Sequence, residues 1–171
     1  MSKLNRLIPL LLVLFLVTAC GFKLQTRADL PPEMQQTRLE IAMPYSEFAR
    51  RLETLLEQGG VDVVKATEGV AVLEVPLNES RKEIQSIGDN ARVREFLIRH
   101  SVQFRLLDKD GNELIPLQSF ELSRVYSFSA QDILSAERED EFLRKELADS
   151  IARMVVRRLG TYQGNSNAAE N

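Results

Sequence analysis

Alternation of apolar and polar side chains predicts β-strands over several parts of the chain. The longest alternating runs are 93–107 and 114–128, and residues 108–112 between them have the composition of a tight hairpin turn. A shorter alternation covers 38–43, and a β-branched run from 70 continues beyond Pro76. Fifteen-residue strands are more than twice the usual length, so we expect a long, strongly twisted sheet.

Apolar residues at helical spacing predict two helices. Ser46 is placed to cap the first, which Gly59 and Gly60 end. Ser129 is expected to cap the second, with Asp132 in its first turn. The first apolar stripe is Phe48, Leu52, Leu55 and Leu56, and the second, within 142–159, is Leu143, Leu147, Ile151, Met154, Val155 and Leu159.

The order of these elements predicts an α+β fold. A strand, a helix and a strand over 38–75 favour a right-handed crossover and a parallel pair of strands. The full order β-α-β-β-β-α indicates two helices packed on one face of a mostly antiparallel, four-stranded mixed sheet. We expect one domain at 38–162, after an extended, proline-containing tether at 20–37 and before a disordered polar tail at 163–171.

The N-terminus has the layout of a secretory signal peptide over residues 1–19. Positive residues precede an apolar run at 7–17, which at eleven residues is too short to span a membrane. Thr18 and Ala19 then precede Cys20, so cleavage there exposes the only cysteine for attachment of lipid. An ordinary signal peptide is the alternative, but it leaves an unpaired thiol in an oxidising compartment.

Composition narrows the function classes. Without residues 1–19 the chain has 152 residues, enough for one core, and its net charge changes from −3 to −5 because Lys3 and Arg6 are lost. An acidic chain without a basic stripe argues against nucleic acid as a partner. Because no nucleophile, phosphate-loop or zinc-protease motif is present, we expect no enzyme activity and no cofactor.

The histidine and the acidic clusters of the chain are better explained by structural roles than by metal binding or catalysis. His100 is the only histidine and lies on the apolar side of a predicted strand, where packing is favoured over zinc binding. Asp108, Asp110 and Glu113 do not match a calcium loop, because glycine is the fourth residue and Ser119 the twelfth. The acidic residues 139–141 are expected on a solvated helix face.

Five arginines deserve separate treatment because guanidinium groups bind phosphate bidentately. Each one alone is most simply a solubilising residue of a sheet face. Together, near one end of the long hairpin, they indicate an anion-contact site. The five are Arg92, Arg94, Arg99, Arg105 and Arg124.

The stretch Leu-Val-Thr-Ala-Cys-Gly-Phe-Lys-Leu at 16–24 resembles the N-terminus of the LptE family of lipopolysaccharide-assembly lipoproteins, and the order of elements up to Leu159 is similar. The resemblance implies an outer-membrane lipoprotein, anchored at Cys20, that plugs the LptD β-barrel, helps it assemble and takes part in lipopolysaccharide delivery. Gly21, in place of an inner-membrane retention aspartate, implies outer-membrane sorting.

The same resemblance implies that the protein binds lipopolysaccharide, and that it lies on the periplasmic side of the outer membrane and in the barrel lumen. Arg92, Arg94 and Arg99 are then the candidate lipopolysaccharide-binding residues. A general outer-membrane lipoprotein adaptor, which binds another periplasmic or barrel partner, is the alternative.

Overall fold

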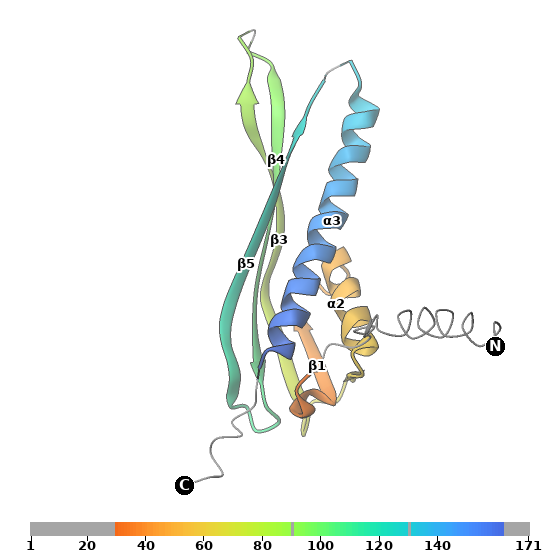
Figure 1. The fold of residues 1–171 in the computed structure, drawn as a ribbon, viewed down its shortest axis with the longest axis vertical. Coiled ribbons are helices and arrows are strands. Elements are labelled where there is room, and N and C mark those ends of the chain that lie inside the picture. Colours follow the sequence, from red (N-terminus) through yellow and green to blue (C-terminus); the bar gives the residue numbers. More distant parts are fainter. Residues whose placement is uncertain (1–29, 90, 130, 163–171) are drawn as a thin grey trace, which may run out of the picture.

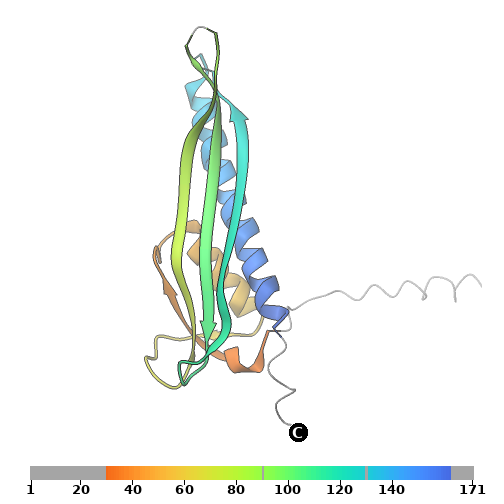
Figure 2. The same cartoon turned by 90° about the vertical axis from the view of Figure 1, so that its left-hand side faces the viewer.

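The computed structural model describes residues 30–89, 91–129 and 131–162, so the expected signal peptide, Cys20 and the tail lie outside the described residues. A long, twisted sheet carries both helices on one face, and its other face has no helix over it (Figures 1 and 2). In chain order the elements are η1 (Pro32–Met34), β1 (Gln36–Ile41), α2 (Glu47–Gln58), β2 (Asp62–Val63), β3 (Ala71–Ile87), β4 (Val93–Leu107), β5 (Glu113–Ser127) and α3 (Ile133–Gly160).

The α+β class and the mixed sheet are confirmed, but the sheet has five strands and not four. Its order is β2-β1-β3-β4-β5, and β1 is parallel to both of its neighbours. The β3–β4 and β4–β5 pairs are antiparallel. The extra strand is β2, which a turn through Gly69, at a positive φ of 76°, separates from β3. The predicted order counts one strand between the first helix and the long hairpin, where the structure has two.

The folded part begins earlier than the predicted boundary at residue 38. Met34 is fully buried, and its carbonyl accepts a hydrogen bond from Thr37 Oγ1 at 2.8 Å. The backbone N–H of Asp62 donates to the carbonyl of Gln35 at 2.8 Å. The η1 turn and the start of β1 therefore belong to the folded domain and not to an extended tether, because Met34 is part of its core.

The N-cap of α2 was predicted correctly, whereas the N-cap of α3 was not. Ser46 caps α2 as expected, since its Oγ accepts a hydrogen bond from the N–H of Ala49 at 3.1 Å. The cap of α3 is Asp132 and not Ser129, because the Asp132 carboxylate accepts from the N–H of Ser135 at 3.3 Å. Ser129 instead donates its hydroxyl to the side chain of Gln131.

Two hydrophobic clusters lie one above the other along α3. The larger joins both helices to the lower half of the sheet, and the smaller, around Ile98 and Leu147, joins only α3 to the upper half. A helix of 28 residues is about 42 Å long, which is why α3 reaches both clusters (Figure 1). The predicted stripe of α3 is buried except for Met154, which is half-buried.

Within the described residues, no helix combines the length and the apolar character that a membrane span requires.

Candidate functional site

The β3–β4 turn forms the end of the molecule farthest from η1 (Figure 1). Here the N–H of Gly88 donates to the carbonyl of Arg92 at 2.8 Å, and Ala91 has a positive φ of 56°. The side chains of Arg92 and Arg94 are exposed at this end. The structure thus brings two of the three candidate lipopolysaccharide-binding residues together.

Arg99 lies apart from this pair. It follows Arg94 by five residues along β4, or about 16 Å of extended chain. Arg99 forms ion pairs with Glu121 on β5 and with Glu83 on β3. Arg99 thus connects β4 to both neighbouring strands, and the predicted set of five arginines is not gathered at one end.

The open face of the sheet carries charged side chains along its length, together with the exposed Val125. Besides Arg99, it carries Arg105, which pairs with Glu74 at 2.6 Å, and Arg81, which pairs with Glu79 at 2.6 Å. The fifth arginine, Arg124, points to the opposite face and pairs with Glu146 of α3 at 3.3 Å. The arginines of the open face therefore lie in ion pairs between and along neighbouring strands, and two of them, Arg99 and Arg105, each face two carboxylates.

Asp140 is not the solvated residue that the sequence analysis expected. Its carboxylate accepts hydrogen bonds from Tyr126 and Arg144 and pairs with Lys82 at 3.0 Å. The Lys82 ammonium also lies 4.3 Å from the centre of the Phe96 ring. Burial raises the pKa of Asp140, but the hydrogen bonds from Arg144 and Lys82 outweigh burial and lower it. This network ties the upper half of α3 to the sheet.

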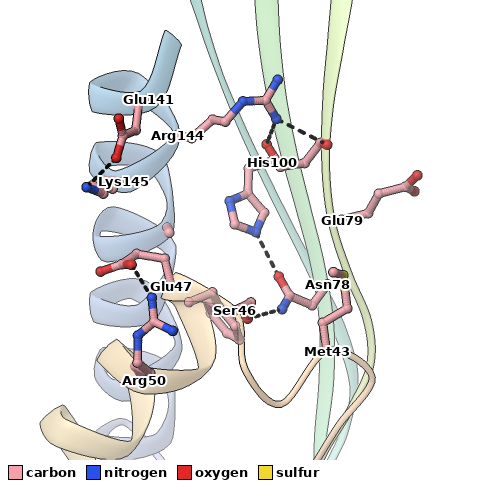
Figure 3. Close-up of a pocket in the computed structure, with 13 residues that line it drawn as sticks. Met43, Ser46, Glu47, Arg50, Asn78, Glu79, His100, Glu141, Arg144 and Lys145 are labelled. Atoms are coloured by element: carbon pink, nitrogen blue, oxygen red, sulfur yellow. Dashed lines mark hydrogen bonds and ion pairs between the residues drawn. The ribbon is translucent and has the colours of Figure 1, made fainter. Parts of the chain in front are cut away.

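A cleft of about 490 Å³ opens on the helix side, where the first turn of α2 meets β3, β4 and α3 (Figure 3). Its wall is a chain of three polar side chains. Asn78 donates from Nδ2 to Ser46 Oγ at 2.8 Å, and His100 Nε2 lies 2.9 Å from Asn78 Oδ1. Because that oxygen can only accept, His100 carries its proton on Nε2.

His100 is buried as predicted, with 5% of its surface exposed, and its second ring nitrogen, Nδ1, has no hydrogen-bond partner among the described residues. Burial lowers the pKa of His100 below its ordinary value of 6.5, and the nearby guanidinium of Arg144 lowers it further. The neutral ring is therefore the stable form in the fold. The sequence alone did not identify Asn78 as the partner of this ring, or Ser46 as the acceptor for Asn78.

This burial predicts a loss of stability in mild acid. The unfolded state takes up a proton near pH 6.5 and the folded state only at lower pH, so the free energy of unfolding falls as the pH drops from about 7 to about 5, by at most about 1.4 kcal/mol per pH unit. Urea unfolding across this range measures it. His100→Gln removes the titrating group, so a variant with the same pH dependence as the wild type contradicts the prediction.

The acidic turn at 108–112 is a hairpin turn, as predicted. Asp108 Oδ1 accepts from the N–H groups of Asp110 and Asn112, each at 2.8 Å, and Oδ2 accepts from the side chain of Asn112. The Asn112 side chain is the main cause of the lowered pKa of Asp108. Across the described ranges, no cluster of three or more metal-ligating side chains occurs.

An elongated sheet with two helices on one face is the fold of several small bacterial lipoproteins. Lipoprotein B from Nitrosomonas europaea is similar with a TM-score of 0.71 and 24% identity, over 88% of this chain and 97% of that one. The rare lipoprotein B from Shewanella oneidensis is similar with a TM-score of 0.64 and 24% identity, over 74% and 94%. These two structures show that the chain shares its fold with bacterial lipoproteins.

The family model LptE, described as lipopolysaccharide-assembly, matches residues 34–159. The LPS-assembly lipoprotein LptE of Yersinia enterocolitica serotype O:8 is 30% identical over 159 residues, which are 91% of this chain and 76% of that protein. Its counterpart in Yersinia pestis strain Pestoides F is 32% identical over 161 residues, 92% and 77%.

The chain belongs to the LptE family, which confirms the resemblance seen at its N-terminus. Membership assigns it to lipopolysaccharide transport at the outer membrane of Gram-negative bacteria, in a family of assembly lipoproteins that is not known for enzymes.

Proposed function

We propose that this protein forms a complex with the LptD β-barrel, in which it acts as a plug and assembly factor and takes part in delivering lipopolysaccharide to the outer leaflet. The open face of the sheet is the observation that carries this proposal. That face is polar and its charges are paired, for example Arg99 with Glu83 and Glu121. Barrels of porin size enclose an aqueous lumen, which a polar surface of this kind suits.

The size of the open face also suits a stable complex. Strands of 15 residues extend about 50 Å, and three strands side by side are about 14 Å wide. Their product, about 700 Å², is close to the roughly 800 Å² that each partner buries in a standard interface. The face is therefore large enough to hold the protein in a barrel without any contribution from the helices.

The proposal places the protein on the periplasmic side, held by lipid on Cys20. Two or more acyl chains on one cysteine anchor a protein firmly, whereas a single chain binds a membrane only marginally. Gly21 supports sorting to the outer membrane. The intact mass of the protein purified from membranes tests this part, because a free thiol or a retained leader contradicts it.

Purification from detergent-solubilised envelope tests the complex. We expect a stoichiometric LptD barrel with the wild-type chain and its loss when bulk is added to the open face, in Ser119→Trp with Ser123→Trp. Both serines are exposed on β5. The matched control is Glu53→Trp with Glu57→Trp on the exposed side of α2, which is expected to keep the barrel.

Two results argue against the proposal. If the wild-type chain brings down a different protein in stoichiometric amount and no barrel, it is a general lipoprotein adaptor. If depletion of the protein leaves LptD maturation unchanged, it is not an assembly factor for that barrel.

A further inference from the structure

The cleft beside His100 lies on the helix side of the sheet, away from the open face that the barrel proposal uses (Figure 3). We propose that this cleft binds a neutral, hydroxyl-rich molecule of the saccharide class. Its volume of about 490 Å³ is within the range of roughly 300–1,000 Å³ that is typical of small-molecule sites. This inference does not depend on a barrel partner.

The wall of the cleft holds polar groups with unused hydrogen-bonding capacity. Ser46 Oγ accepts from Ala49 and from Asn78, while its own proton has no acceptor among the described residues. His100 Nδ1, an acceptor in the neutral ring, is buried and has no hydrogen-bond partner in the described part of the chain, so a ligand hydroxyl must enter the inner end of the cleft to reach it. The hydrogen bonds through Asn78 fix both groups in place, so a ligand meets them already positioned and pays little ordering entropy.

Charges at the rim of the cleft select against ions. Three cations line the cleft, and each has a carboxylate beside it. Arg50 pairs with Glu47 at 2.6 Å, Lys145 pairs with Glu141 at 2.8 Å, and Arg144 pairs with Asp140. Glu79 also lines the cleft, and its carboxylate pairs with Arg81 at 2.6 Å. An anion would have to displace a carboxylate, and a cation would have to displace a guanidinium or an ammonium group.

A hydroxyl group has neither difficulty, because it accepts a hydrogen bond from the cation of a pair and donates one to the carboxylate. A sugar presents several such groups on one small ring, together with C–H faces. Met43, 55% exposed at the edge of the cleft, offers an apolar contact for such a face. Paired charges, fixed polar groups and an exposed apolar side chain thus favour a saccharide over a phosphate or a zwitterion.

Because His100 is the only histidine, its ring gives an unambiguous nuclear magnetic resonance signal in the untagged, ¹⁵N-labelled, full-length protein in detergent. The probes are glucose, galactose and maltose at millimolar concentration, compared with inorganic phosphate and glycine betaine. We expect saturable shifts of the His100 ring and of the Asn78 side-chain amide with at least one sugar, and none with phosphate or betaine.

Glu141→Gln with Lys145→Gln removes one rim pair, whose side chains are 69% and 56% exposed, and is expected to weaken sugar binding about tenfold. Arg105→Gln with Glu74→Gln removes an ion pair of the open face, so it is the matched control and is expected to leave binding unchanged. Absence of a saturable shift with all three sugars overturns the inference. So does equal weakening in both variants, or tighter binding of phosphate or betaine at His100.

Discussion

Arg92→Glu with Arg94→Glu is expected to weaken the binding of lipopolysaccharide by at least tenfold. Both side chains are exposed at the β3–β4 turn (the distal turn, residues 88–92), where the phosphate groups of lipopolysaccharide can reach them. A hydrogen bond to a charged group contributes about 1.5–3 kcal/mol, and about 1.4 kcal/mol corresponds to a tenfold change in affinity. Direct titration of the full-length protein in detergent at fixed, moderate salt measures the effect.

The matched control for this prediction is Lys109→Glu with Arg153→Glu, which changes the net charge by the same amount away from the distal turn. An equal loss of affinity in both variants would show that only total charge matters. Unchanged affinity in the turn variant would exclude the turn as a contact. Arg99→Gln is expected to have a smaller effect, because two carboxylates already hold that guanidinium.

Leu147→Ala is expected to lower the free energy of unfolding by about 2–5 kcal/mol, because it leaves a cavity at a fully buried site. Leu147 belongs to the smaller cluster, where α3 alone covers the sheet and few neighbours can move in to fill the space. Since small domains are stable by only about 5–15 kcal/mol, this is a large part of the total. Urea unfolding at neutral pH measures the change.

Phe142→Ala is the control for this second prediction. Phe142 also lies on α3 and is larger than leucine, but it is 62% exposed, so its truncation is expected to change the free energy of unfolding by less than about 0.5 kcal/mol. If the two variants are equally stable, the smaller cluster contributes little to folding and α3 is held by its lower half.

Local patterns in the sequence were sufficient to predict most of the helices and strands. Alternation over 93–107 gave β4 its observed bounds, because a strand with one buried face must repeat every two residues. Ser46 was recognised as a cap because the interaction lies within one turn of helix. The stripe of α3 was recognised because buried positions recur every three or four residues along a helix.

Features that depend on distant parts of the chain were missed. Strand β2 has two residues, and it exists only because β1 offers a free edge beside it. Asp140 was predicted from its acidic neighbours to be solvated, whereas its partners Lys82 and Tyr126 come from two different strands. The order in which strands pair, and not their composition, brings these groups together.

In the candidate site too, local patterns were predicted and contacts between distant parts of the chain were missed. His100 was correctly placed on the apolar side of its strand, but nothing nearby in the sequence identifies Asn78 as its partner or Ser46 as the next residue in the chain of hydrogen bonds. They meet because Ser80 pairs with His100 in the β3–β4 register, which puts Asn78 on the same face two residues away, and because α2 begins above that point. A lone histidine on an apolar strand face is the one local signal that such a buried polar contact is present.

The two clusters along α3 give the molecule unequal resistance to opening. At the base, two helices and five strands exclude water from the larger cluster, whereas near the distal turn a single helix covers three strands. Backbone amides of the upper part of α3 are thus shielded by fewer layers, and thermal fluctuations can separate this end from the sheet while the base stays intact. The end that carries Arg92 and Arg94 can thereby adapt its shape to a bulky ligand without the rest of the protein unfolding.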